Sequence, residues 1–237
     1  MNFLEYYLKE DSVLDNANFK KWFGNSKVVD KNNNPLIVYH GSNNKFNKFS
    51  YENLGIQGRS EGVGFYFTDN KQIADSYGKY LYSCYLKIEK PLRTNAKNFS
   101  RNQIQKIIKY IIDLQKTTQN ISMKDGFLSN FGDIEYEGIN AVLKDTVDAH
   151  IDLSSASDFQ GSLIGAGVDP EIVNLAIYKV TGIDGIIAKG WGDYEDSNLI
   201  IYIPFFAKQI KSINNNGNFN SNSDNINEKV QAYEEIK

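Results

Sequence analysis

The segment Pro35-Leu-Ile-Val-Tyr-His-Gly-Ser42 indicates how the chain folds, and Gly64-Phe-Tyr-Phe-Thr-Asp69 and Tyr77 follow it. Residues 36–39 are apolar and partly β-branched, which predicts a buried strand. The strand ends in a histidine and a glycine, which would place an imidazole and a bare backbone edge at the lip of a cleft. Glycine lets a flat ligand approach the main chain closely, because it has no Cβ. A core strand followed by a turn explains the same segment equally well.

The composition fits one folded domain. The chain has 237 residues, of which 41% are hydrophobic and 13% aromatic, and this is enough to build a single core. The net charge of -3 and the pI near 5.5 do not indicate the basic surface of a nucleic-acid-binding protein. No apolar run is long enough to span a membrane and no signal-peptide pattern is present. We therefore expect neither a nucleic-acid partner nor a membrane association.

Cysteine and histidine are rare in this sequence. The single cysteine, Cys84, excludes an internal disulfide and suits a reducing compartment. With only His40, His150 and Cys84 as soft ligands, no metal site is expected. His150 stands near two aspartates and is expected on the solvated surface. The localisation that follows is cytoplasmic, or delivery into a host cytosol without a classical leader.

Hydrophobic patterning predicts a mixed α+β domain over residues 1–213. A helix is expected to end at Gly24, and another is expected to start at a cap on Asp69 or Asn70, with Ile73, Ala74 and Tyr77 on one face. Residues 95–182 are expected to form a helical insertion. In it, a capping box is expected at Ser100–Gln103, and a helix that starts at Asp169 is expected to stop at Gly182. Strands are expected at 36–39, 64–68, 82–88, 185–188, 199–203 and 209–213. Residues 43–63 form a long polar connection of the kind that often serves as a lid. In residues 214–227, eight of fourteen are asparagine, so residues 214–237 are expected to form a flexible tail.

Three aromatic side chains are spaced so that they could line one slot. His40 ends the first strand, Tyr66 lies in the second, and Tyr77 follows on the next helix. Two tyrosine rings can sandwich a flat heteroaromatic ring. The imidazole could hold a ribose hydroxyl, and the Gly41 backbone could pair with a carboxamide. Each tyrosine, taken singly, also fits a place in the core.

In this order and spacing, the motifs resemble those of a known enzyme superfamily. Tyr39-His-Gly-Ser42 and the Gly64–Asp69 segment, with Ala74 and Tyr77, resemble the NAD-binding motifs of diphtheria-toxin-like and poly(ADP-ribose) polymerase-like ADP-ribosyltransferases. More narrowly, four segments look like the transferase domains of phage and mobile-element polyvalent proteins. They are Trp22-Phe-Gly-Asn-Ser-Lys-Val-Val29, Pro35-Leu-Ile-Val-Tyr-His-Gly-Ser42, Asp184-Gly-Ile-Ile187 and Gln209-Ile-Lys-Ser212. The match covers about residues 19–94 and 182–213.

The resemblance implies a fold and a set of binding residues. The fold would be α+β, with a split antiparallel sheet core that forms an NAD cleft and with the helical insertion at about 95–182. His40 would bind the ribose on the nicotinamide side and Gly41 the carboxamide. Tyr66 and Tyr77 would stack on the nicotinamide ring. Two further residues, Ser42 and Phe67, would belong to the same NAD-binding set.

The superfamily's third catalytic element is usually a glutamate that opens a late strand. The corresponding run here is Ser197-Asn-Leu-Ile-Ile-Tyr202, which puts Asn198 at that position. A carboxylate there stabilises the positive charge that develops on the ribose, whereas an asparagine supplies no charge. Asp196 and Glu195 stand close by, and either could substitute. A solvated turn over residues 193–196 explains these acids equally well.

The resemblance implies an enzyme that transfers a single ADP-ribose from NAD to a protein side chain and releases nicotinamide. Such a protein would act as a toxin or effector on an acceptor protein. Within the enzymes, the alternatives are NAD hydrolysis and transfer to nucleic acid. Outside the enzymes, the alternative is a non-catalytic module that binds NAD or ADP-ribose. The uncharged Asn198 would suit such a module.

Overall fold

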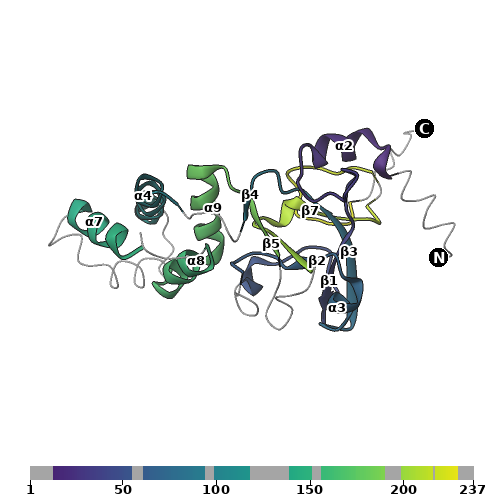
Figure 1. Ribbon diagram of the computed structural model, residues 1–237, viewed down its shortest axis with the longest axis horizontal. Helices are drawn as coiled ribbons and strands as arrows, with labels where there is room; N and C mark the ends of the chain where they lie inside the picture. The colour runs from purple at the N-terminus through teal and green to yellow at the C-terminus, as the bar shows by residue number, and fades with distance from the viewer. Residues whose placement is uncertain are drawn as a thin grey trace, which may run out of the picture.

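The computed structural model describes residues 13–54, 61–93, 99–117, 139–150, 156–189, 199–215 and 217–228. Within them the chain has an α+β fold built on a seven-stranded sheet, with the strand order β4-β5-β6-β2-β1-β3-β7. A group of helices lies beside this sheet at one end of the long axis (Figure 1). The α+β class predicted from the sequence is therefore confirmed.

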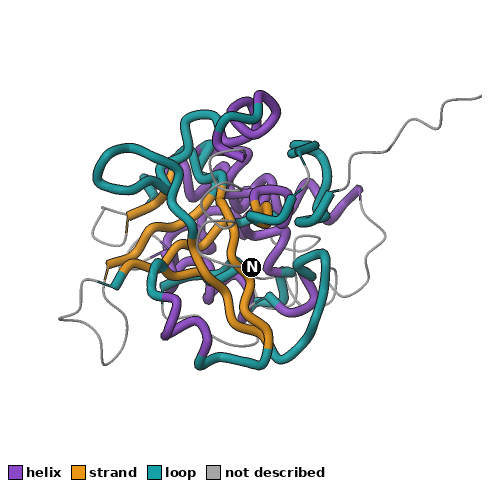
Figure 2. The backbone as a smooth tube through the Cα atoms, turned by 90° about the vertical axis from the view of Figure 1, so that its right-hand side faces the viewer, coloured by secondary structure: helices purple, strands orange, loops and turns teal. Residues whose placement is uncertain are grey.

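The sheet is mixed and strongly twisted (Figure 2). Strands β4 and β5 are parallel, and the other neighbours are antiparallel. The described strands form one sheet, because the short β2 hydrogen-bonds to both β1 and β6 and so joins the two halves of the split core expected. The strands are β1 (Val38–Ser42), β2 (Phe67–Thr68), β3 (Tyr80–Leu86), β4 (Pro91–Arg93), β5 (Gly185–Lys189), β6 (Ile200–Pro204) and β7 (Ile210–Ser212).

Helix α2 (Ala17–Phe23) packs at the end of the molecule opposite the helical group (Figure 1). The Asn16 side chain caps its start by accepting hydrogen bonds from two backbone N–H groups. The helix ends at Gly24, whose φ of 55° suits a glycine, as the sequence predicted. Trp22 is buried here, and its indole nitrogen donates to the Lys208 carbonyl. Shorter elements are α3 (Lys71–Asp75) and the 3₁₀ turns η1 (Tyr51–Asn53) and η3 (Ala207–Gln209).

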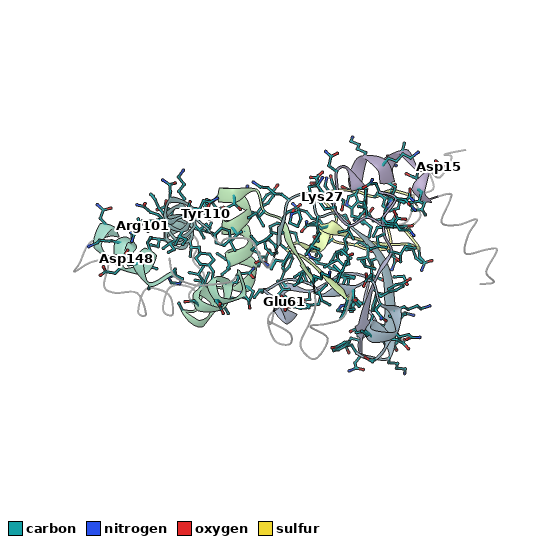
Figure 3. The ribbon with its side chains drawn as sticks, viewed as in Figure 1. Asp15, Lys27, Glu61, Arg101, Tyr110 and Asp148 are labelled. Atoms are coloured by element: carbon teal, nitrogen blue, oxygen red, sulfur yellow. The ribbon has the colours of Figure 1, made fainter. Side chains whose placement is uncertain are left out.

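Between β4 and β5, the described residues form four helices, which we call the helical lobe: α4 (Arg101–Thr117), α7 (Ile139–His150), α8 (Ala156–Gly165) and α9 (Pro170–Thr181). Helix α4 packs against α7 and α9, and α8 packs against α9. Arg101 on α4 also forms an ion pair with Asp148 on α7 (Figure 3). Ser100 and Gln103 form the capping box predicted at the start of α4. Helix α9 follows Asp169 and ends at Gly182, which is left-handed, as the sequence also predicted.

The helical lobe and the sheet share one hydrophobic core. Isoleucines along one face of α4, at helical spacing, are all buried. They belong to the same cluster as apolar residues of β5 and β6, so the lobe covers one face of the β4–β5–β6 half of the sheet. The members named here are Ile104, Ile107, Ile108, Ile111 and Ile112 from α4, Ile186 and Ala188 from β5, and Ile201 and Ile203 from β6.

The prediction of a solvated His150 was wrong. The side chain is 2% exposed, at the end of α7. Its Nδ1 lies 2.6 Å from the Thr146 carbonyl oxygen and its Nε2 lies 3.0 Å from the Ser162 hydroxyl. Burial lowers the pKa of His150, and the hydrogen bond to Thr146 offsets only part of that. The neighbouring aspartates suggested a wet surface, but α8 covers this histidine through a contact that local sequence does not show.

The asparagine-rich segment also differs from the flexible tail that was expected. Phe219 and Ile226 are buried, and the Ile226 N–H donates to Asn47. The Lys211 ammonium on β7 is fully buried and donates to the carboxylate of Glu228 at 2.7 Å. It also donates to the backbone carbonyls of Ser223 and Asn225. Composition did not predict this packing, because the packing depends on a few buried side chains rather than on periodic apolar residues. Residues 216 and 229–237 lie outside the described part of the chain.

Glu228→Gln should destabilise the protein strongly, because it keeps the shape of the side chain but leaves the buried Lys211 without a counter-charge. Breaking a buried ion pair typically costs about 3–5 kcal/mol in the free energy of unfolding. Denaturant unfolding followed by circular dichroism measures it. The matched control is Asp113→Asn, which removes an ion pair with Lys109 that is about half exposed. This control should change the free energy of unfolding by less than about 0.5 kcal/mol.

The same pair should make stability sensitive to acid. Burial by itself would raise the pKa of Glu228, but the hydrogen bonds that it accepts, first from Lys211, lower it below the usual 4.5. The unfolded chain therefore takes up the proton first, so the free energy of unfolding should fall as the pH drops below 4.5. Glu228→Gln should lose this part of the acid dependence. Parent and variant with the same stability and the same acid profile would contradict the assignment.

Candidate active site

A small cavity lies at the sheet where β1, β2 and β6 meet α3. Its volume is about 260 Å³. Most of its lining is aromatic or apolar, and a backbone edge and one imidazole supply polar atoms. The lining residues are Tyr39, His40, Gly41, Tyr66, Phe67, Thr68, Ile73, Ala74, Tyr77 and Ile201. Five of the residues expected from the sequence to bind NAD (His40, Gly41, Tyr66, Phe67 and Tyr77) are thus brought together around one cavity.

Helix α3 forms one wall because it packs unusually close to β1. Asn70, one of the two caps that the sequence allowed, caps its start: its side chain accepts from the Gln72 and Ile73 N–H groups. A Cβ built at Gly41 would lie 1.9 Å from the carbonyl oxygen of Ala74. No other residue fits there, so glycine at this position is required by the approach of α3 as well as by any ligand.

The His40 side chain is fixed by a hydrogen bond to the neighbouring strand. Its Nδ1 lies 2.8 Å from the Tyr66 carbonyl oxygen. A carbonyl oxygen only accepts, so Nδ1 carries the hydrogen. Burial lowers the pKa of His40, and the bond to Tyr66 offsets only part of this, so the ring is neutral at pH 7. A neutral ring with hydrogen on Nδ1 has a lone pair on Nε2, which can accept a hydrogen bond from a hydroxyl.

Aromatic rings surround the His40 imidazole and hold its plane. Phe49 and Phe67 have ring centroids 5.0 and 5.4 Å from it, and Phe46 and Tyr82 lie slightly further away. These rings exclude water from that side of the imidazole, which is the source of the lowered pKa. The site therefore presents an uncharged acceptor in apolar surroundings.

The two tyrosines expected to stack on a ligand differ in how they are held. The Tyr66 hydroxyl donates to the Gly62 carbonyl oxygen at 2.7 Å, which ties the ring to the segment before β2. Tyr77 lies two residues beyond α3 and is 53% exposed at the mouth of the cavity. Tyr66 is thus held in place, whereas much of the Tyr77 side chain faces solvent and can be covered by a ligand.

The backbone of β1 offers hydrogen-bonding groups beside these rings. Strand β2 pairs with β1 only at Tyr39, opposite Thr68. Among the described strands, none pairs with this edge of β1 further along, at Gly41. An amide group of a ligand could take the place of the missing strand there.

Some predicted site residues are not part of this cavity. Ser42 ends β1, and its hydroxyl accepts from the Asn44 N–H in the following turn, so it does not line the cavity. The three candidates for the third catalytic element, Asn198, Asp196 and Glu195, lie outside the described residues. The strand that follows them in sequence does reach the site, since Ile201 of β6 lines the cavity.

Five lining residues, Ala74 of the quoted motif among them, were not predicted to bind NAD. Thr68 and Ile73 were assigned to a strand and a helix face, and Tyr39 to the interior. Ile201 comes from a strand more than a hundred residues away, and its place follows from pairing opposite Thr68. The alternation of side chains along a strand would have identified Thr68, but no local signal identifies Ile201.

Two residues of the motifs that carried the resemblance have structural roles away from the cavity. The Asp184 carboxylate accepts from the backbone N–H groups of Glu89 and Lys90, at 2.9 Å each. The Gln209 amide donates to the carbonyls of Lys87 and Asp184. These bonds join the chain leaving β3 to the start of β5 and to η3.

Within the described ranges, no group of three or more His, Cys, Asp or Glu side chains could hold a metal ion. In the same part of the chain, no helix has the length and apolar character needed to cross a membrane.

An aromatic cavity with a neutral imidazole and an open strand edge has the shape and polar groups to accept a planar polar ligand. A family model described as "ADP-ribosyltransferase in polyvalent proteins" matches residues 30–219. This span is most of the 237-residue chain, so the chain belongs to this family of ADP-ribosyltransferase domains. Comparisons with curated proteins and with solved structures give no match.

Gly41→Ala should destabilise the fold, since the new methyl group would collide with the Ala74 carbonyl and push α3 away from β1. Forcing a methyl group into such a contact typically costs about 1–3 kcal/mol. The control is Gly161→Ala on α8, where a Cβ meets nothing within 4 Å. That change should gain about 0.5–1 kcal/mol, because alanine favours a helix over glycine. Chemical unfolding measures both, and a Gly41→Ala protein as stable as the parent would refute the close contact.

Proposed function

We propose that this domain is a mono-ADP-ribosyltransferase that transfers ADP-ribose from NAD to a side chain of an acceptor protein and releases nicotinamide. The observation that supports this most directly is the cavity lined by His40, Gly41, Tyr66 and Tyr77 in a chain of this family. The donor atoms, acceptor atoms and rings of the cavity match the parts of nicotinamide riboside.

The cavity has a size that suits the nicotinamide end of NAD. Its volume of about 260 Å³ lies below the usual range for whole drug-sized ligands. A nicotinamide ring would enter between Tyr66 and Tyr77, and its carboxamide would meet the open edge of β1 at Gly41. The adjoining ribose would then place a hydroxyl at Nε2 of His40. The rest of the dinucleotide would extend out of the cavity.

The reaction breaks the bond between C1′ of the ribose and the ring nitrogen of nicotinamide. The bonding electron pair leaves with nicotinamide, which becomes neutral, and positive charge develops on the ribose. A nucleophilic side chain of the acceptor then bonds to C1′ and loses its proton to solvent. Tyr66 and Tyr77 hold the leaving group, while His40 fixes the ribose, so the chain supplies orientation for this substitution.

The group that would place a negative charge beside the developing cation is still to be assigned. Asn198 would hydrogen-bond to the ribose without stabilising its charge, and Asp196 or Glu195 would supply a carboxylate from the same segment. The second candidate function, a module that binds NAD without turnover, is favoured by Asn198. Removing one electrostatic element of this kind typically lowers the rate about 100- to 1,000-fold.

We also propose that the acceptor is met in a reducing compartment, either the cytoplasm of the source cell or a host cytosol. The lone thiol, Cys84, is fully buried in β3, and burial raises its pKa far above the usual value. A protein acceptor is preferred over nucleic acid because the net charge of -3 does not favour a polyanion.

The experiment is incubation of the whole chain with NAD labelled in its adenylate, in the presence of a cell lysate. Label in protein together with released nicotinamide would support the proposal. Label in nucleic acid, or only in free ADP-ribose, would replace the protein acceptor with one of the alternatives. Binding of NAD by calorimetry without release of nicotinamide would establish the non-catalytic module. His40→Ala is the inactive control.

Tyr77→Ala should weaken NAD binding more than it lowers stability, because the side chain is 53% exposed before a ligand covers it. Loss of an aromatic that stacks on a base typically costs about 1–3 kcal/mol of binding. Tyr178→Ala is the matched control: this tyrosine is 41% exposed but lies on α9, away from the cavity. Calorimetry with NAD and thermal unfolding compare the two. Unchanged affinity in Tyr77→Ala would exclude it from the binding site.

Asn198→Glu should raise the rate of nicotinamide release if Asn198 occupies the position of the third catalytic element, since it restores a carboxylate beside the developing cation. If Asp196 or Glu195 already supplies the charge, two carboxylates would crowd together and the gain would disappear or reverse. Asp196→Asn and Glu195→Gln then identify the working acid as the change that abolishes turnover while NAD still binds. Parent-like rates in all three variants would place the element elsewhere.

A further inference from the structure

Two buried amides of the helical lobe hold the backbone just before β2. Gln160 on α8 and Asn174 on α9 are both 0% exposed. The Val63 N–H donates to Oε1 of Gln160 at 2.8 Å, and Nδ2 of Asn174 donates to the Val63 carbonyl at 2.9 Å. Nε2 of Gln160 also donates to the Asn174 side-chain oxygen at 2.6 Å. We call Gln160 and Asn174 the amide clasp.

The amide clasp provides hydrogen-bond partners for the backbone N–H and carbonyl of Val63, which pairs with none of the described strands. Residues 61–66 are irregular, so the polar groups of Val63, which is 1% exposed, need hydrogen bonds from elsewhere. Because the Val63 N–H only donates, it must meet the oxygen of Gln160, which fixes the orientation of both amides. Burying an amide without hydrogen bonds is costly, so each member of the clasp depends on the others.

Through Val63, the amide clasp holds the backbone next to Gly62, and Gly62 in turn binds the Tyr66 hydroxyl. Gly62 precedes Val63, has φ of +131°, and its carbonyl accepts the Tyr66 hydroxyl at 2.7 Å. A Cβ at Gly62 would lie 2.7 Å from Oε1 of Gln160, so the backbone and the clasp are in close contact. Figure 3 labels Glu61, the residue before Gly62, where the helical lobe meets the strands.

Tyr66 is therefore held at both ends. Its carbonyl receives the Nδ1 hydrogen of His40, and its hydroxyl is held by Gly62, which the clasp positions through Val63. We infer that Gln160 and Asn174 are positioning residues for the NAD site: through Gly62 and Val63 they set the angle at which the Tyr66 ring faces the cavity. The helical lobe thereby contributes to the binding site, although none of its described residues lines the cavity. This inference rests on the proposed function.

The test compares Gln160→Met with the parent, because methionine keeps the length of the side chain and removes its hydrogen bonds. The affinity for NAD should fall about 10-fold or more, since the ring that faces the ligand is misplaced. Ser162→Ala is the control on the same helix: it removes the contact with His150 but leaves the clasp intact, and it should not change the affinity. Should Gln160→Met fail to fold, Asn174→Ala, which removes one bond to Val63 and the acceptor for Nε2 of Gln160, takes its place.

A double-mutant cycle with Tyr66→Phe separates positioning from general stability. Phenylalanine makes no hydrogen bond to Gly62, so in that background Gln160→Met should cost much less affinity than it does alone. Equal losses in both backgrounds would show that the clasp does not act through the Tyr66 hydroxyl, and would overturn the inference.

A second readout does not depend on NAD. In protein carrying ¹³C-labelled tyrosine, the Tyr66 signal is assigned by its loss in Tyr66→Phe, and Gln160→Met should shift or broaden it. Ser162→Ala should leave it unchanged. If the signal moves but the parent binds no NAD, the positioning holds and the proposed function fails. If the parent binds NAD and the signal of Gln160→Met is unmoved, the inference fails and the function stands.

Discussion

The two-residue strand β2 holds the sheet together, and the candidate site depends on it. Phe67 and Thr68 bond to β6 on one side, and Thr68 meets β1 on the other at a single position. Without this strand the described sheet would divide into β1–β3–β7 and β4–β5–β6, the split core that the sequence resemblance implied. The cavity opens beside β2 because the pairing of β2 with β1 stops at Tyr39, whereas β1 continues to Ser42. This leaves an unpaired edge of the β1 backbone beside the aromatic rings. The candidate site therefore exists because β2 is short.

A strand this short cannot fix its own position, so groups outside the sheet must do so. The His40 imidazole bonds to the Tyr66 carbonyl from β1, and Gln160 and Asn174 hold Val63 from the helical lobe. Between these two anchors only a few residues remain. The second anchor is buried and the first is partly buried. In such surroundings a broken hydrogen bond leaves an unsatisfied group and costs more than it would in water. The approach to β2 is therefore held by side-chain hydrogen bonds rather than by regular structure.

Sequence reasoning succeeded where the signal was local. The Ser100 capping box and the glycines that end α2 and α9 were predicted, and Asn70 was one of two caps predicted for α3, because caps depend on residues a few positions apart. The gathering of His40, Tyr66 and Tyr77 was predicted from their order along the chain. Sequence reasoning failed at His150 and in the asparagine-rich segment, where the contacting residues come from other elements. The ammonium of Lys211 is buried only because Glu228 and two carbonyls reach it.

The same distinction explains why residues 95–182 were set apart as an insertion. Periodicity shows that a stretch is helical but not what its apolar face covers. Here that face shares a core with β5 and β6, so removing the helices would expose Ile186, Ile201 and Ile203 to water. The contacts from Gln160 and Asn174 to Val63 span 97 and 111 residues of sequence. A segment that completes the core and also holds the approach to β2 cannot be removed without changing the cavity, even though it carries none of the motifs.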